Sequence, residues 1–326
     1  DEEWYPTDIS WRNYQDPKNR ELDKEKKPAA AYEMLDVDDN VYFDGLTAQK
    51  SIKDLKKLQN SNSPFFLAVG FVKPHLPFTA PKKYWDLYKE SDIKLPIQNI
   101  FPESAPNLAN HQWGELRRYR DIPKKGPIDH EMSKKLIHAY YASVSYVDAQ
   151  IGKLLNALDD FGLRDNTIVV LVGDHGWSLS EHGLWAKHSN FEVALHVPMI
   201  ISAPNFAVNV KTNSIAELVD IYPTLCELTT GPKPKHLQGT SLVYSMSNPE
   251  KLLKTTALAR WKRGETLIYN DFFYTEWKLQ SGRISRMLYD HSNDPDETKN
   301  LAILESYSDM VESLSQQLKR FKETFN

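Results

Sequence analysis

The chain of 326 residues is poor in the features that would assign it to several common classes of protein. Its single cysteine, Cys226, excludes an internal disulfide framework and leaves the redox compartment open. No apolar run approaches the roughly 20 residues that cross a bilayer, so we expect no membrane-spanning segment and no membrane partner. The first residues include neither an initiator methionine nor the apolar region of a signal peptide, so we expect the chain to start after a removed segment.

The charge of the chain is nearly balanced, with 40 basic and 44 acidic residues and a net charge of -4. This balance supplies no broad attraction for nucleic acid or for an anionic membrane. Any anion must therefore be recognised locally. The sequence also has no Asn-x-Ser/Thr acceptor, which argues against a heavily glycosylated lysosomal or secreted chain.

The hydrophobic content of 40% predicts a substantial globular core. Apolar spacing predicts helices over 46–59, 133–158 and 223–230, and buried strands over 65–72, 167–172 and 197–201. This alternation favours an α/β fold. Residues 1–40 are polar and predict an extended surface segment, whereas 76–131 predict long loops. Short alternating strands and an amphipathic helix predict a small antiparallel subdomain over 251–326, after a main domain over 1–250.

The most informative stretch begins with the apolar run 167–172, which predicts a central strand covered on both faces. Ligands of open α/β sheets gather beyond the carboxyl ends of such strands, and Asp174 and His175 follow this one directly. A carboxylate beside an imidazole offers oxygen and nitrogen donors to a divalent cation, and Gly176 allows close backbone approach. For an isolated Asp-His pair, a loop cap and a buried histidine remain the alternative.

Two more residues have side chains suited to an anion. Lys187 lies in a loop with Trp185 and His188, from which its ammonium could return to the strand end as a point charge. A lone lysine is usually just solvated. His75 follows the predicted strand 65–72 and stands between two prolines, which hold its direction.

Several segments, in order, resemble the sulfatase family. They are Gly173-Asp174-His175-Gly176 with its continuation to Ile201, Pro64 to Phe78 around Lys73-Pro74-His75, Tyr140 to Asp148, Asp220 to Leu225, and Leu288 to Leu301. Many sulfatases carry Asn where His175 stands, so the Asp-His form is most similar to the iduronate-2-sulfatase branch. The resemblance covers the chain from about residue 37 onward.

The resemblance implies an alkaline phosphatase-like fold, with a mixed sheet between helices, and hydrolysis of sulfate esters in sulfated sugars or glycosaminoglycans. It implies that Asp174 and His175 bind Ca²⁺, with Mg²⁺ or another divalent ion as alternatives. It further implies that Lys187 and His75 bind the sulfate, while Trp177 and His182 line the pocket. A lysosomal, extracellular or periplasmic location would follow, although the absence of glycosylation acceptors weighs against the lysosome.

Sulfatases of this type use a formylglycine made from a Cys/Ser-x-Pro-x-Arg motif, preceded by an Asp-Asp pair that completes the metal site. Cys226 lacks that context and is predicted to be a buried residue of a helix. Asp38-Asp39 is predicted to be a surface turn. We therefore expect the nucleophile and two metal ligands in an N-terminal part of the same protein, and negligible turnover by residues 1–326 alone.

Two other functions remain open from the sequence. A phosphate-ester or phosphonate hydrolase of the same superfamily would share an Asp-His-Gly strand end, and a Ser or Thr nucleophile would distinguish it. A non-catalytic paralogue could retain half of an anion site.

Overall fold

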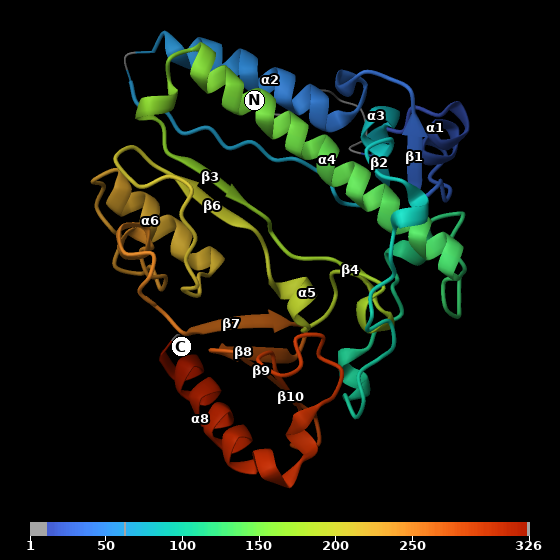
Figure 1. Cartoon of the computed structure of the whole chain (residues 1–326), viewed down its shortest axis with the longest axis vertical. Helices are drawn as coiled ribbons and strands as arrows, with labels where there is room; N and C mark the ends of the chain where they lie inside the picture. The colour runs from blue at the N-terminus through green and yellow to red at the C-terminus, as the bar shows by residue number, and fades with distance from the viewer. Residues whose placement is uncertain (1–11, 62, 325–326) are drawn as a thin grey trace. The chain divides into compact units, whose positions relative to one another are not determined.

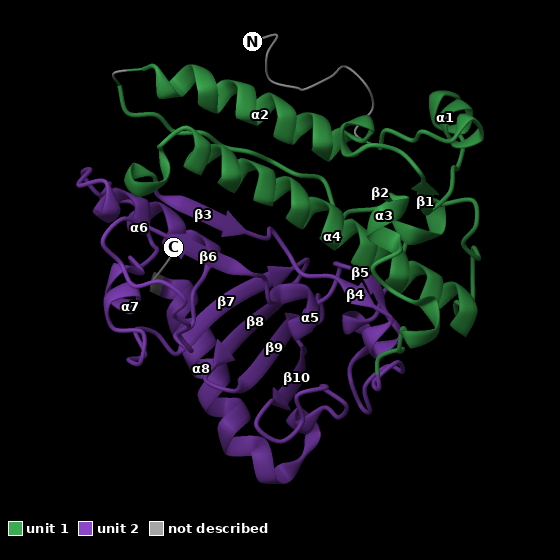
Figure 2. Cartoon of the chain, turned by 45° about the horizontal axis from the view of Figure 1, so that its top comes forward, with its two compact units in different colours: residues 1–96, 113–167 green, residues 97–112, 168–326 purple. Residues whose placement is uncertain are grey.

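The computed structural model describes residues 12–61 and 63–324. The chain divides into two compact units, one formed by residues up to Pro96 and by Trp113–Thr167, the other by Ile97–Gln112 and Ile168–Asn326 (Figure 2). Among the described residues, no helix combines the length and the apolar character that a bilayer crossing requires.

The first unit contains two long helices that lie side by side, α2 (Phe43–Gln59) and α4 (His130–Asp160) (Figure 1). Two short helices, α1 (Pro17–Lys24) and α3 (Lys82–Trp85), and two parallel strands, β1 (Tyr32–Leu35) and β2 (Phe78–Pro81), complete it. Helix α4 begins earlier than the predicted residue 133, because the carboxylate of Asp129 accepts the Met132 amide as its cap.

The predicted surface segment over residues 1–40 is wrong for much of the part that can be described. Residues 17–24 are helical, strand β1 pairs with β2, and the side chains of Ala31 and Glu33 are buried. Asp38 is exposed as predicted for a turn, but Asp39 is buried among cationic and polar side chains. The polar residues of this segment led to the wrong prediction, because a sequence does not distinguish a charged residue that is buried with a partner from one on the surface. Residues 1–11 lie outside the described residues.

The segment 65–72 is also not the buried strand that its composition predicts. Its residues form no described strand pairing, and exposed and half-buried side chains alternate along it, with Phe66 83% exposed. A run of apolar residues indicates that a segment is suited to burial. It does not identify the other segment that would have to pack against it.

In the second unit, β3 (Val169–Val172) pairs antiparallel with β6 (Met199–Ser202). Short strands β4 (Ser178–Leu179) and β5 (Trp185–Ala186) pair with each other. The helices here are α5 (Glu192–Leu195), α6 (Ile221–Leu228) and α7 (Val243–Ser247). Cys226 is a buried residue of α6, as predicted. The prediction that β3 is covered on both faces is wrong for the described residues, because Val172 is 38% and Ile200 58% exposed.

The predicted C-terminal antiparallel sheet is present in the same unit. Its strands β7 (Thr256–Trp261), β8 (Gly264–Tyr269), β9 (Phe272–Lys278) and β10 (Ile284–Asp290) pair in chain order. Helix α8 (Ser308–Thr324) packs Leu314 and Leu318 against Leu267, Tyr274 and Leu288 of this sheet (Figure 1). Because residues 168–250 belong to the same compact unit, a domain boundary at residue 250 remains a prediction.

Candidate active site

The Asp-His pair lies on a loop that leaves β3 and is held against the backbone of α5. The amides of Gly176 and Trp177 donate to the carbonyls of Ala194 and Val193, both at 2.9 Å. A Cβ atom on Gly176 would lie 2.1 Å from the Val193 oxygen, so only glycine permits this approach. The glycine after the pair thus serves backbone packing.

The side chains of Asp174 and His175 present two donor atoms close together. His175 Nδ1 lies 2.8 Å from the Gly176 carbonyl, which can only accept, so Nδ1 donates this bond and Nε2 is the ring nitrogen left to meet a cation. That Nε2 lies 3.6 Å from Oδ2 of Asp174, whose side chain is 90% exposed. Because Ca²⁺ binds oxygen ligands at about 2.3 to 2.6 Å, atoms at this separation can reach one cation.

The donor pair fits part of a cation site. Within residues 12–61 and 63–324, no group of three or more His, Cys, Asp or Glu side chains could hold a metal ion. A Ca²⁺ ion takes six to eight oxygen ligands, so Asp174 and His175 by themselves would bind it weakly.

The ammonium of Lys187 lies over the ring of Trp177. This ammonium is 5.3 Å from the centroid of the Trp177 ring, and the His175 ring centroid is 6.1 Å from that of Trp177. An ammonium at this distance from an indole face is attracted by the ring quadrupole. The structure therefore brings Asp174, His175, Trp177 and Lys187 together in one unit.

His182 occupies a different environment from the pocket wall that the sequence comparison implied. It lies in the turn Glu181–Gly183 at φ 56°, and its residue is only 4% exposed. Its Nε2 lies 3.2 Å from the buried carboxylate of Glu297, and its ring packs on Phe191 with centroids 4.2 Å apart. These contacts support the loop, and the place of His182 in a substrate pocket stays a prediction.

His75 lies in the first unit, so the structure does not test its grouping with the other candidates. Its Nε2 is 2.8 Å from Glu115, and its Nδ1 is 2.5 Å from the Leu76 carbonyl. The preceding Lys73 is buried, and its ammonium donates to the carbonyls of His75 and Pro77 at 3.0 and 2.5 Å. Burial lowers the pKa of Lys73 to about 8, although the charges of Asp44 and Glu33 oppose this shift.

Sequence reasoning missed the acidic partners of both histidines. Glu115 stands 40 residues after His75, and Glu297 stands 115 residues after His182. Neither spacing follows a helical or strand period, so no local signal points to these pairs. Glu297 lies within the segment 288–301 that supports the family resemblance. This position indicates that the segment matters, but it does not identify His182 as the partner of Glu297.

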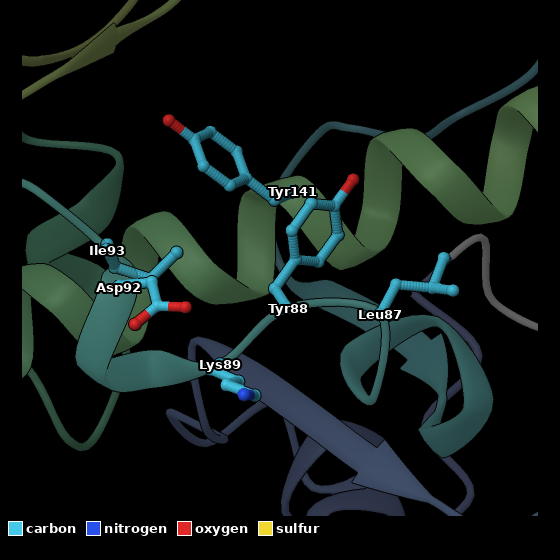
Figure 3. A pocket seen from close by; sticks show the side chains of 6 residues that line it. All are labelled: Leu87, Tyr88, Lys89, Asp92, Ile93 and Tyr141. Carbon is cyan, nitrogen blue, oxygen red and sulfur yellow. The ribbon is translucent and has the colours of Figure 1, made fainter.

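A surface cavity of about 320 Å³ in the first unit contains none of the candidate residues (Figure 3). Its lining consists of Leu87, Tyr88, Lys89, Asp92, Ile93 and Tyr141. The Tyr88 hydroxyl is already bonded to Ser145 at 2.6 Å, and the cavity contains no pair of side chains resembling the Asp174–His175 donors. The loop after β3 therefore remains the candidate active site.

This chain is similar to known sulfatases over most of its length. Residues 4–231 match the family model described as sulfatase, and residues 180–324 match that of the N-sulphoglucosamine sulphohydrolase C-terminal region. Iduronate 2-sulfatase of Homo sapiens is 37% identical over 227 residues, covering 60% of this chain and 41% of the relative. The enzyme of Mus musculus is 34% identical, covering 71% and 48%. This chain spans about half the length of these curated relatives.

Solved structures show the fold. A protein determined in complex with its substrate D-glucosamine-2-N,6-O-disulfate aligns with a TM-score of 0.74 at 21% identity, over 87% of this chain and 70% of its own. The phosphonate monoester hydrolase of Agrobacterium radiobacter aligns at 0.75 and 20% identity, over 92% and 64%. These likenesses confirm the predicted alkaline phosphatase-like α/β class. The family match over residues 4–231 and the 34% identity to the Mus musculus enzyme over 71% of this chain establish that it belongs to the sulfatase family.

Proposed function

We propose that the protein hydrolyses sulfate esters of sulfated sugars, as an iduronate-2-sulfatase-like enzyme. The observation that carries the proposal is the 3.6 Å approach of His175 Nε2 and Asp174 Oδ2 after β3, together with Trp177, whose ring lies near both His175 and the ammonium of Lys187. A carboxylate, an imidazole lone pair and an ammonium suit a site where an anionic ester meets a divalent cation. When bound, the cation supplies positive charge against the sulfate oxygens.

Each side chain then has a defined part. Asp174 and His175 would hold the cation, and the Gly176 carbonyl fixes the proton on His175 Nδ1 so that Nε2 remains a ligand. Lys187 would bind the sulfate and stabilise the charge that develops on its oxygens. His75 would stabilise the bridging oxygen, with Glu115 holding its ring. The indole of Trp177 would shield the ammonium of Lys187 from water on one side.

The loop of Lys187 continues into an aromatic and basic surface that supports an acidic sugar as substrate. The ring of His188 stacks on Trp261, with centroids 4.7 Å apart, and Lys262 lies at the turn between β7 and β8. Asn190 fastens this turn through a 3.2 Å hydrogen bond to the Gly264 carbonyl. Positive charge on this turn would attract the carboxylate and sulfate groups of the sugar.

We further propose that residues outside this chain, in an N-terminal part of the same protein, supply a formylglycine nucleophile and two further metal ligands. The support is that this chain spans about half the length of its curated relatives and that its described residues hold two clustered donors. The exposed Ile200, on the face of β6 that it shares with Leu171 of β3, offers an apolar contact for such residues.

The test compares three aryl esters with one leaving group: a sulfate, a phosphate and a phosphonate. We expect the protein produced from its complete gene to hydrolyse the sulfate fastest by at least tenfold, and residues 1–326 alone to hydrolyse it negligibly. Faster phosphonate or phosphate hydrolysis would favour the sister activity whose fold this chain shares. No hydrolysis of any ester would favour a non-catalytic anion-binding protein. Measurable sulfate turnover by residues 1–326 would contradict the proposed external nucleophile.

A further inference from the structure

The carboxylate of Glu297 occupies a central position in the second unit. Its side chain is 3% exposed, and its oxygens lie 3.2 Å from Nε2 of His182 and 3.3 Å from Nε2 of His291. The same carboxylate accepts the backbone amide of Glu192 at 3.2 Å, at the start of α5. A buried carboxylate is stable only with such partners, because it has lost its hydration.

This carboxylate joins three segments that are distant in sequence. His182 belongs to the turn after β4, Glu192 opens α5, and His291 follows β10, where its ring stacks on Phe273 with centroids 4.0 Å apart. Helix α5 in turn provides the carbonyls to which Gly176 and Trp177 donate. A continuous set of hydrogen bonds therefore runs from Glu297 through α5 to the loop after β3.

We propose that Glu297 is a positioning residue for the loop that carries Asp174 and His175. It holds α5 and the 181–183 turn in place, and thereby fixes the backbone behind the donor pair. The assignment of that loop to the active site rests on the proposed function. The hydrogen bonds from Glu297 through α5 to Gly176 and Trp177 are independent of the proposed function. The positioning role of Glu297 and the proposed function can therefore be tested separately.

The bridge is expected to be pH-sensitive. The charged and titratable groups around it are His182 with the neighbouring Glu181, His291, Tyr289, Asp294, and Glu192 at the start of α5. Burial lowers the pKa of His291, but the Glu297 hydrogen bond and nearby acidic charges outweigh it and leave that pKa raised. A raised histidine pKa means that its contribution is complete below about pH 6.5 and is lost as pH rises through the folded-state value.

Burial opposes ionisation of Glu297, yet its hydrogen bonds with His182 and His291 leave its pKa lowered. Its contribution is therefore present above about pH 4.3 and is lost as the pH falls through the lower folded-state value. Together, these directions predict the firmest bridge between about pH 4.5 and 6.5.

Amide hydrogen exchange in residues 1–326 tests the proposal directly. We expect Glu297→Ala to accelerate exchange at Gly176 and Trp177 at least tenfold, and Glu297→Gln to do so less. The matched control is Glu276→Gln, which removes a largely buried carboxylate bonded to Tyr274, Arg286 and Ser315 in the same unit. Unchanged exchange in folded Glu297→Ala would overturn the proposal, as would equal acceleration by the control. If Glu297→Ala fails to fold, His291→Gln provides the same readout and the same criteria.

Two further measurements separate positioning from simple stabilisation. In the wild-type chain, protection of Trp177, corrected for intrinsic exchange, should fall as pH rises above 6.5, and Glu297→Gln should flatten this profile. A wild-type profile that is already flat would contradict the bridge. Inorganic sulfate, followed by the Trp177 resonance, should bind at least fivefold more weakly to Glu297→Gln than to Glu276→Gln. If Lys187→Ala leaves sulfate binding unchanged, the proposed function fails, while the exchange data still decide the role of Glu297.

Discussion

The buried ammonium of Lys73 donates a hydrogen bond to the backbone carbonyl of His75 at 3.0 Å. The carboxylate of Asp44 accepts the amides of Val72 and Lys73, so the segment leading into His75 is held from both sides. The backbone position of His75 therefore depends on a buried charge two residues earlier.

The lowered pKa of Lys73 predicts that its contribution to stability depends on pH. The unfolded chain binds a proton on Lys73 up to about pH 10.4, whereas the folded chain releases it near pH 8. Between these values the unfolded state binds more protons, so the contribution of Lys73 to stability rises with pH. We expect the free energy of unfolding of wild type, relative to Lys73→Met, to rise by about 2 to 3 kcal/mol from pH 7 to pH 10.

Urea unfolding at several pH values measures this difference. Lys56→Met, an exposed lysine of α2 in the same unit, is the control and should show no such rise. A difference between wild type and Lys73→Met that stays constant over this range would mean that Lys73 keeps its ordinary titration in the folded protein.

Asp39 gives a second prediction, with an adjacent control. Its carboxylate lies 2.6 Å from Lys153 and 2.7 Å from Lys83, and Tyr84 donates to it at 2.9 Å. Because both lysines remain partly exposed, we expect Asp39→Asn to cost about 2 kcal/mol, below the range for fully buried pairs. The exposed neighbour in Asp38→Asn should change stability by less than about 0.5 kcal/mol.

The same carboxylate predicts acid sensitivity. Burial alone would raise the pKa of Asp39, but hydrogen bonds from Lys153, Lys83 and Tyr84 outweigh it and lower that pKa to about 2. The contribution is therefore present above about pH 3.9 and is lost as the pH falls toward 2. Denaturation followed by circular dichroism should show that the stability gap between wild type and Asp39→Asn narrows over this interval. A gap that widens on acidification would contradict the assignment.

Lys187 tests the catalytic half of the proposed site. In the protein expressed from its complete gene, we expect Lys187→Ala to lower kcat/KM for an aryl sulfate by about 10² to 10³-fold, the usual effect of removing one charge-stabilising donor. Its melting temperature should stay within about 2 °C of wild type, because Lys187 is not part of the core. Lys319→Ala, on the exposed face of α8, is the control. Equal kinetics in the two variants would remove Lys187 from the site.

A feature of this molecule could be predicted where the residues that determine it are close together in the sequence. Helix α4 and the strands β7 to β9 follow periodic patterns within one element, and the structure contains each of them with shifts at the ends, whereas β10 was not predicted and Val144 of α4 is exposed. The start of α4 moved because Asp129, outside the periodic stretch, makes the cap.

Only part of the candidate site could be predicted from the sequence. Asp174, His175, Trp177 and Lys187 are close in sequence, so a loop that returns to one strand end brings them together. The histidine partners Glu115 and Glu297 are set by tertiary contacts over long separations, which no local pattern encodes. His182 illustrates the consequence: it is close in sequence to Asp174 and Lys187, yet it is buried and its acidic partner Glu297 lies 115 residues further along the chain.

The last prediction concerns the face of β3 and β6 that carries Leu171 and Ile200. Ile200 is 58% exposed, although the sequence around it predicts a buried strand, so residues 1–326 do not exclude it from water. Ile200→Asp should therefore change the stability of this chain by less than about 0.5 kcal/mol, whereas Leu267→Asp, at a site with 0% exposure, should prevent folding.

In the protein from its complete gene, the same Ile200→Asp should instead reduce stability by about 2 kcal/mol or more, because a carboxylate would be buried against the residues proposed to cover this face. Thermal unfolding of both lengths with both variants distinguishes the cases. An Ile200→Asp variant that is equally harmless in the longer protein would show that this face stays exposed to water, and the additional ligands would then have to reach Asp174 and His175 without packing on β6.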